Sequence, residues 1–290
     1  MNTNIGLLGK FLTKILWTHY TFNPWIGCTK ISPGCDFCYA EYMMDTRFGR
    51  VRWGHGAPRQ RTHKANWNLV RRWHRRAIEA DNWTTQEDGR LIQKLRPRVF
   101  VASLADVFDT EVEDSWRNDL FALIRECWGL DFLLLTKRPS VARRYAIELD
   151  TAGKDWPWNA WMGTSVENQD TAFRLRDLDE IPAPVHFLSC EPLLGPLQLD
   201  LSRIDWVIVG GESGPNARPM QKEWAESIKK QCEDQSTLFF FKQWGGRGKD
   251  KGGHLWLDGS EKMEVPTNRL ATFQEEEIRE GKLLPRIPLK

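Results

Sequence analysis

The chain has 290 residues, of which 41% are hydrophobic, and its formal net charge is +2. A chain of this size can bury a large core, and it is long enough to form one domain of the barrel type. Its six cysteines do not form the dense framework of a secreted disulfide protein, and no run of about 18 uncharged apolar residues is present. The composition therefore excludes a disulfide scaffold and a transmembrane helix, and it favours the reducing cytoplasm.

The first residues predict a short amphipathic helix. Over Ile5–Trp17 the apolar residues recur at helical spacing, with Lys10 and Lys14 between them. The lysines interrupt any signal-peptide core, so we expect a helix that packs on the domain rather than a targeting or membrane segment. We treat residues 1–14 as an N-terminal extension and expect a first strand at about Ile15–Thr21.

Three cysteines follow on one Gly/Pro-rich loop. Cys28, Cys35 and Cys38 are separated by six and then two residues. Three thiolates can hold three irons of a four-iron, four-sulfur cluster and leave the fourth iron open to a ligand, whereas a structural metal site normally has four protein ligands. The number of cysteines therefore favours a cluster with a vacant position for chemistry.

A strongly basic stretch comes next. Between Arg47 and Arg76 there are ten basic residues and no Asp or Glu, so the rest of the chain carries 2 − 10 = −8. Interleaved with them are three tryptophans, Trp53, Trp67 and Trp73. Basic side chains release counterions from a phosphate backbone and flat rings stack on bases, which indicates a nucleic acid or a phosphorylated substrate. The alternative is a solvated helix face and a loop whose arginines pair with acids elsewhere. The candidate substrate contacts are Arg71, Arg72 and Arg75.

Apolar runs separated by helical patterns fill the chain as far as Trp244. The expected strands are Val99–Ala102, Phe132–Leu135, Trp161–Thr164, Val185–Leu188, Trp206–Val209 and Leu238–Phe241. The expected helices are Val112–Trp128, Ser140–Leu149, Asp170–Leu178 and Lys222–Cys232. This alternation predicts an α/β fold with a parallel sheet, as a full or partial (β/α)6–7 barrel of the TIM type within one domain, residues 1–290. A doubly wound open sheet is the structural alternative. Residues 47–98 form a basic insertion, and residues 245–290 a loop-rich C-terminal appendage.

Polar residues follow each of these strands. They are Ser103, Asp106 and Asp109; Thr136, Lys137 and Arg138; Ser165 and Glu167; Cys190 and Glu191; Glu212 and Ser213; and Lys242 and Gln243. In a barrel, the carboxyl ends of the strands meet at one mouth, where the chemistry collects. We therefore expect a shared site at this mouth.

The cysteine loop resembles that of the radical S-adenosylmethionine superfamily, whose usual pattern is C-x3-C-x-aromatic-C. Phe37 occupies the aromatic position, although the first gap here is six residues. From about Ile15 to Trp244 the order of motifs is similar to the spore photoproduct lyase branch. It is closer still to a phage and bacterial family of three-cysteine-motif proteins whose reaction is not settled. The motifs that carry this resemblance are Asn-Pro-Trp before the loop, Thr-Lys-Arg-Pro, Ser-Cys-Glu-Pro-Leu-Leu-Gly-Pro and Val-Gly-Gly-Glu-Ser-Gly.

The resemblance implies roles for individual residues. The ligands of a [4Fe-4S] cluster would be Cys28, Cys35 and Cys38, and the open iron would bind S-adenosylmethionine. The candidates for binding this cofactor are Phe37, Tyr39, Ser103, Asp106, Lys137, Ser165 and Glu167. The candidate catalytic residues are Cys190, as a hydrogen donor to a substrate radical, with Lys137 and Glu191. Gly210-Gly211-Glu212 follows a late strand, unlike the Gly-Gly-Glu motif of the superfamily, so we interpret it as a tight turn that lets a ligand or backbone approach closely.

The expected function is a radical enzyme that generates a 5′-deoxyadenosyl radical to modify or repair a nucleic acid or nucleotide-like substrate, with an external electron donor. It would act in the cytoplasm, that of the host if the chain is phage-encoded, without a membrane partner. The alternative is a zinc-binding nucleic-acid-binding protein without radical chemistry, in which His19 or His55 completes a tetrahedral site with the three cysteines. A barrel subunit that binds a cluster or ligand without turnover is a third possibility.

Overall fold

The structure is a computed structural model that describes residue 13 and residues 15–79, 82–85, 91–93, 96–248, 250–266 and 272–273. Most of the expected N-terminal helix, and much of the C-terminal appendage, lies outside these residues. No helix within the described ranges is both long enough and apolar enough to cross a membrane.

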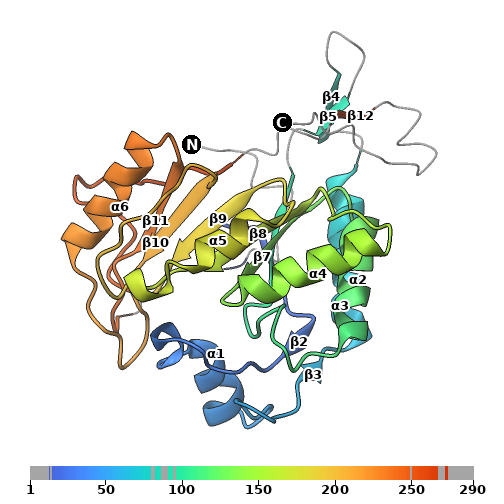
Figure 1. The fold of residues 1–290 in the computed structure, drawn as a ribbon, viewed down its shortest axis with the longest axis horizontal. Helices are drawn as coiled ribbons and strands as arrows, with labels where there is room; N and C mark the ends of the chain where they lie inside the picture. Colours follow the sequence, from blue (N-terminus) through green and yellow to red (C-terminus); the bar gives the residue numbers. More distant parts are fainter. Residues whose placement is uncertain are drawn as a thin grey trace.

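The main element is a seven-stranded sheet in which every strand pair is parallel. Its strands, in spatial order, are β1 (Tyr20–Phe22), β6 (Arg98–Val101), β7 (Asp131–Thr136), β8 (Ala160–Ser165), β9 (His186–Cys190), β10 (Trp206–Gly210) and β11 (Leu238–Gln243). This order follows the chain without the reversal of a doubly wound sheet. The sheet curls into a half-barrel with helices on its convex side (Figure 1). The expected partial barrel is confirmed, and the six later strands lie within a few residues of their expected positions.

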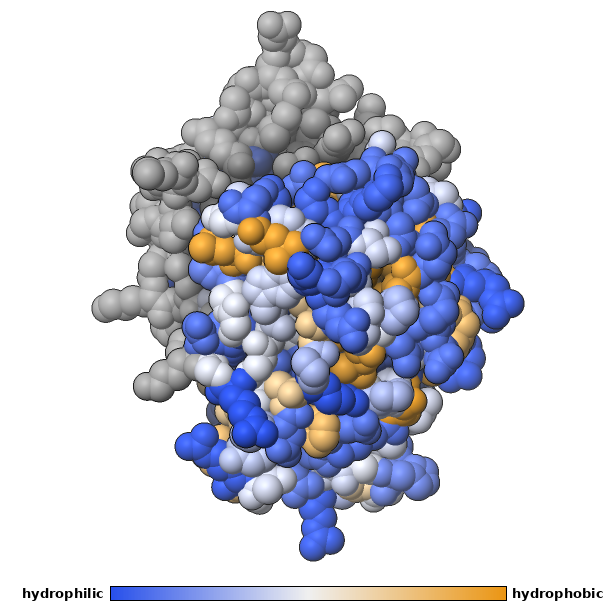
Figure 2. Space-filling view, turned by 90° about the vertical axis from the view of Figure 1, so that its left-hand side faces the viewer, coloured by the Kyte–Doolittle hydropathy of each residue, from blue (hydrophilic) through white to orange (hydrophobic). Residues whose placement is uncertain are grey.

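Helices connect most of these strands. The expected ones are confirmed as α3 (Asp114–Glu126), α4 (Pro139–Thr151), α5 (Arg174–Asp179) and α6 (Lys222–Asp234). The segment expected to be helical over 170–178 divides into a 3-10 turn, Gln169–Thr171, followed by α5. Residues 191–205 link β9 to β10 without a helix. Figure 2 views the molecule from the side that carries α6, where hydrophilic side chains cover most of the described surface.

The expected basic insertion contains one of the helices that cover the sheet. This helix is α2 (Lys64–Ala77), which lies in the chain between β1 and β6 and so completes the first β/α unit. Its apolar residues recur every three or four positions, so they share one face. The residues buried on that face are Trp67, Val70, Trp73 and Ala77. Tyr20 of β1 stacks on Trp73 with ring centroids 4.3 Å apart, so this face of α2 is part of the core.

The two faces of the sheet bury separate apolar clusters, because successive side chains of a strand point to opposite faces. The convex face packs against the helices. The concave face holds a second cluster: Trp17, Phe100, Leu133, Trp161, Val185, Phe187, Trp206, Ile208 and Phe240. These residues fill the lower part of the half-barrel and give its mouth a closed, apolar floor.

Two small antiparallel sheets lie at opposite ends of the half-barrel (Figure 1). At one end β4 (Trp83–Thr85) pairs with β5 (Leu91–Gln93), which pairs with β12 (Thr272–Phe273). At the other end β2 (Trp25–Ile26) pairs with β3 (Gln60–Arg61), close to the short helix α1 (Tyr39–Glu41). This second end is the one at which the strands of the main sheet terminate.

Candidate functional site

The cysteines lie on an excursion of the chain, residues 27–59, that begins after β2 and returns at β3. The pairing of Trp25 with Arg61 closes its base. The excursion contains a 3-10 turn at Pro33–Cys35, helix α1 and a π-helical segment, Tyr42–Arg47. Pro33 suits the first turn of a helix because its missing N–H needs no partner there, and π-helical turns are rare and frequent at functional sites. We call residues 27–59 the cysteine segment.

The first anchor of the cysteine segment is Glu167, which follows β8. Its side chain is fully buried, accepts a hydrogen bond from Ser32 Oγ at 2.9 Å, and pairs with Lys137 Nζ at 2.8 Å and Arg174 Nη1 at 2.9 Å. Burial acts to raise the pKa of Glu167, but the two cations outweigh it and hold the pKa below its ordinary value. Gly34 must lack a side chain here, since a Cβ would lie 2.5 Å from Glu167 Oε1.

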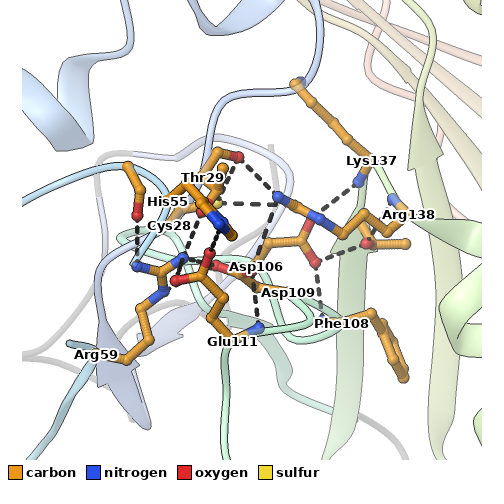
Figure 3. Close-up of polar contacts among 12 residues, drawn as sticks. Cys28, Thr29, His55, Arg59, Asp106, Phe108, Asp109, Glu111, Lys137 and Arg138 are labelled. Atoms are coloured by element: carbon orange, nitrogen blue, oxygen red, sulfur yellow. Dashed lines mark hydrogen bonds and ion pairs between the residues drawn. The ribbon is translucent and has the colours of Figure 1, made fainter. Parts of the chain in front are cut away.

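The second anchor is Arg138, which follows β7 (Figure 3). Its guanidinium donates to the Thr29 carbonyl at 2.7 Å, pairs with Asp106 at 3.0 Å and lies 3.8 Å from Cys28 Sγ. Asp106, after β6, also accepts a hydrogen bond from Thr136 Oγ1 at 2.6 Å. Two strand ends are thus joined to the first cysteine through one buried ion pair.

A third anchor lies beside it. Arg59 pairs with the fully buried Asp109 at 2.7 Å and donates to Thr29 Oγ1 at 2.6 Å. The exposed ring of His55 contacts Glu111, with 2.6 Å between Nδ1 and Oε1 (Figure 3). The carboxylates after β6 therefore hold both ends of the cysteine segment.

Arg218, from the loop after β10, is the fourth anchor. It pairs with Glu212 at 2.7 Å and with Asp36 at 3.1 Å, and it donates to the Pro33 carbonyl at 2.8 Å. Its guanidinium also lies 5.0 Å from the centroid of the Phe37 ring. Arg218 and Arg59 are not predicted from the sequence, because neither stands directly after an apolar run and only the fold brings them to the cysteines.

The three thiols of the segment are free and partly buried. Burial, and next the Asp106 carboxylate, raise the pKa of Cys28, against the opposing effect of Arg138. Burial also raises the pKa of Cys38, while the N–H groups of Glu41 and Ala40 and the charge of Lys137 act to lower it. The Lys137 charge interacts with Cys35 as well. Cationic and N–H groups of this kind stabilise thiolates, the form that binds a metal.

These donors fit an iron–sulfur cluster in their chemistry, because three free thiols share one segment beside compensating cations. Among the described residues, no three His, Cys, Asp or Glu side chains lie together so as to hold a single metal ion. In a four-iron cluster each thiolate binds a different iron. This finding therefore applies to a site for one metal ion, such as zinc. His19 lies before β1 and accepts a hydrogen bond from Arg98 N at 2.9 Å, at the far end of the sheet from the cysteines. It is therefore a wrong choice for a fourth ligand.

Tyr39 and Ser103 meet across the mouth. The Tyr39 hydroxyl donates to the Ser103 carbonyl at 2.6 Å. Ser103 Oγ accepts a hydrogen bond from Asn23 at 3.1 Å. Ala102, directly before it, has a φ of 64°, which residues with a side chain rarely adopt. Strain of this kind clusters at functional sites.

The candidate catalytic residues after β9 lie on different faces of the sheet. Glu191 follows Phe187 and Ser189 on the concave face, where it forms an ion pair with Lys242 of β11. Cys190 points the other way, is fully buried in the cluster of the convex face, and has its pKa raised by burial. Burial behind the sheet separates its thiol from the mouth, so we no longer consider it a candidate hydrogen donor.

The remaining predicted residues lie in different parts of the molecule. Ser165 is buried at the end of β8, where its carbonyl accepts a hydrogen bond from Arg174 at 2.7 Å. Gly211 lacks room for a side chain, since a Cβ would lie 1.9 Å from the Trp244 carbonyl oxygen, which confirms the close backbone approach expected there. Arg71 lies on α2 outside the mouth and pairs with Glu126 at 2.7 Å.

The structure places the second half of the basic stretch away from the mouth. Its exposed residues Arg72 and Arg75 also belong to α2, on the convex side of the half-barrel. Trp67 and Trp73 are buried, so they offer no free ring to a base. The arginines expected to contact a substrate are not brought to the cysteines.

Compared with models of known protein families, residues 12–284 match the family described as "Protein of unknown function (DUF5131)". The chain belongs to this family. No curated protein and no solved structure matches the chain. The matched residues include the whole cysteine segment and all seven strands of the main sheet, so the site belongs to the part that defines the family.

Proposed function

We propose that this protein is a radical S-adenosylmethionine enzyme that modifies or repairs a nucleic acid or nucleotide-like substrate at the mouth of the half-barrel. We interpret the half-barrel as an open form of the TIM-type barrel. One observation carries the proposal: a segment with three free cysteines is anchored to residues that follow four strands of a parallel sheet, β6, β7, β8 and β10. Strand ends of this kind are where barrels carry their chemistry.

In this proposal Cys28, Cys35 and Cys38 hold a [4Fe-4S] cluster. When bound, the cluster supplies one electron for the reductive cleavage of S-adenosylmethionine, and an external donor restores it. Arg138 and Lys137 balance the negative charge of the thiolates from opposite sides of the segment. Their own partners, Asp106 and Glu167, fix the positions of these cations.

The concave face supplies the rest of the site. Lys137, Glu191 and Lys242 all continue, on the same face, strands whose earlier residues form the apolar floor. A charged rim above such a floor can bind the polar groups of a cofactor and substrate while the floor excludes water from below. Lys137 and Glu191 are the residues we assign to cofactor or substrate contact.

Anaerobic reconstitution with iron and sulfide tests the proposal. A brown protein with about four irons per chain that cleaves S-adenosylmethionine under dithionite is the expected result. Cys35→Ala should lose the cluster and keep the fold, whereas Cys127→Ala, at a cysteine buried away from the segment, should retain it. A colourless protein with one tightly held zinc ion would overturn the proposal, as would normal iron content in Cys35→Ala.

A further inference from the structure

The cysteine segment carries an unusual concentration of exposed aromatic rings. Ten large hydrophobic residues are exposed among the described residues, and half of them fall between residues 31 and 48. These five are Ile31, Phe37, Tyr39, Tyr42 and Phe48. Single exposed apolar residues are normal on a protein surface, but a concentration of them marks a binding surface. The Tyr39 hydroxyl is already engaged within the protein, which leaves Phe37, Tyr42 and Phe48.

Arginines accompany these rings. Arg47 and Arg50 lie over the Phe48 ring, at 5.2 and 5.5 Å from its centroid, and Arg218 lies over Phe37. Contacts of this kind hold a ring and a guanidinium side by side on the surface, and Phe37 and Phe48 remain exposed. We call Phe37, Tyr42, Phe48 and the neighbouring Arg47, Arg50 and Arg52 the aromatic platform.

The unpaired charge of the platform is positive. Arg47, Arg50 and Arg52 are exposed, and within the part of the chain that the structure describes none of them forms an ion pair. The acidic residues nearby are engaged: Asp36 with Arg218, Glu41 with Lys30 at 2.6 Å, and Asp45 with the N–H of Trp53 at 2.7 Å. Asp36 and Glu41 are thus paired with cations, and the three unpaired arginines outnumber the single unpaired carboxylate, Asp45, so the platform attracts anions.

Exposed rings beside free arginines match the two parts of a single-stranded nucleic acid. The rings stack on bases, and the guanidinium groups pair with phosphates. In a duplex the base faces are covered by their neighbours, so rings that stand out from the surface cannot stack on them without unpairing. A neutral protein partner would not account for three unpaired arginines. Charge complementarity therefore favours a single strand.

We propose that the aromatic platform binds a single-stranded segment of nucleic acid, with bases stacked on Phe37, Tyr42 and Phe48, and delivers one nucleotide to the mouth. The delivery step rests on the proposed function, whereas the binding itself requires no cluster. The platform replaces the outward face of α2 as the surface that contacts the substrate.

Fluorescence anisotropy with the full chain tests this binding, using labelled twelve-nucleotide oligo(dT) and oligo(U) with a duplex of equal length as competitor. We expect the single strands to bind more tightly than the duplex, and Tyr42→Ala and Phe48→Ala each to weaken binding about tenfold, since one stacked base is lost with each ring. The tighter of the two homopolymers identifies DNA or RNA. The matched control is Phe173→Ala, which removes an exposed ring outside the platform and should leave binding unchanged.

Preferential binding of the duplex, no binding of either strand, or equal binding by the platform variants and the wild type would overturn the inference. The platform residues are exposed, so their variants should keep the wild-type unfolding midpoint and a loss of binding cannot be ascribed to misfolding. A chain that binds single strands through the platform but does not cleave S-adenosylmethionine would keep this inference and refute the proposed function. Cleavage of S-adenosylmethionine by a chain that does not bind single strands would refute this inference and keep the radical chemistry of the proposed function.

Discussion

Helix α2 and the cysteine segment both combine aromatic side chains with arginines but use them differently. The basic stretch runs from the last part of the cysteine segment through α2. On α2 the apolar residues recur at intervals of three or four and pack against β1 and its neighbours. On the cysteine segment Phe37, Tyr42 and Phe48 are five and six residues apart, an interval that forms no helical face, and they stay exposed. Spacing, not composition, decides which rings are available to a ligand.

The largest expected effect is on the buried side of this comparison. Trp73→Ala should lower the free energy of unfolding by about 3–5 kcal/mol, because it removes a ring stacked on Tyr20 and leaves a cavity. Phe48→Ala should change it by less than about 0.5 kcal/mol. Urea denaturation of both variants gives the two values. Similar losses in the two would show that the regions do not differ as described.

Acid should also lower the free energy of unfolding through His74 of α2. His74 accepts a hydrogen bond from Gly129 N at 3.2 Å, and burial lowers its pKa from 6.5 to about 4. In the unfolded chain His74 binds a proton below about pH 6.5, whereas in the folded chain it binds one only below about pH 4. The neutral His74 therefore contributes about 1–3 kcal/mol to the stability above about pH 6.5, and this contribution is lost as the pH falls towards about 4. His74→Asn, which can keep the acceptor but cannot titrate, should flatten this part of the stability–pH curve; an unchanged slope would contradict the assignment.

A smaller effect is expected where the cysteine segment meets Glu167. In Gly34→Ala the new Cβ meets the Glu167 carboxylate, which should weaken the docking of the segment by about 1–3 kcal/mol. We expect faster proteolysis within residues 31–48 and less iron retained after reconstitution, with little change in overall unfolding. Gly195→Ala is the control, since its Cβ would have no neighbour closer than 3.6 Å. Equal protease resistance in the two variants would count against Glu167 as an anchor.

The smallest effect distinguishes the two basic surfaces. Replacement of Arg47, Arg50 and Arg52 by Glu should make the slope of log binding constant against log salt less negative by about 2, the value for three lost contacts to a single strand. As a control, replacement of Arg72 and Arg75 on α2 by Glu should leave this slope unchanged. The opposite pattern would return substrate binding to α2.

Much of the fold was accessible from the sequence, because strands buried on both faces appear as continuous apolar runs. Val207–Val209 and Phe239–Phe241 are such runs, and both lie in strands of the main sheet. The first strand was harder, since Trp17 belongs to the concave cluster and not to β1. For α2 the alternative of a solvated helix face missed the buried side, because the basic residues of the stretch concealed an apolar face of only four residues.

The site was accessible only in part. The cysteines and the polar residues after each strand follow from local patterns, so the sequence predicted Lys137, Arg138 and Glu167 near the mouth. The pairing of Arg59 with Asp109 and of Arg218 with Asp36 depends on how the sheet curls, which no local pattern specifies. The face on which a side chain lies at a strand end is also hard to predict, because neighbouring residues point to opposite faces. Cys190 lies behind the sheet, whereas Glu191, the next residue, lies on the side of the mouth.

The order of the strands along the chain has a consequence for synthesis on the ribosome. Each strand of the main sheet pairs with the one before it, so the sheet can grow as the chain emerges. The anchors of the cysteine segment arrive much later: Glu167 is 135 residues beyond Ser32, and Arg218 is 182 residues beyond Asp36. Until then the cysteine segment lacks both of these anchors. Under the proposed function, we expect the cluster to be inserted before the segment is fully anchored.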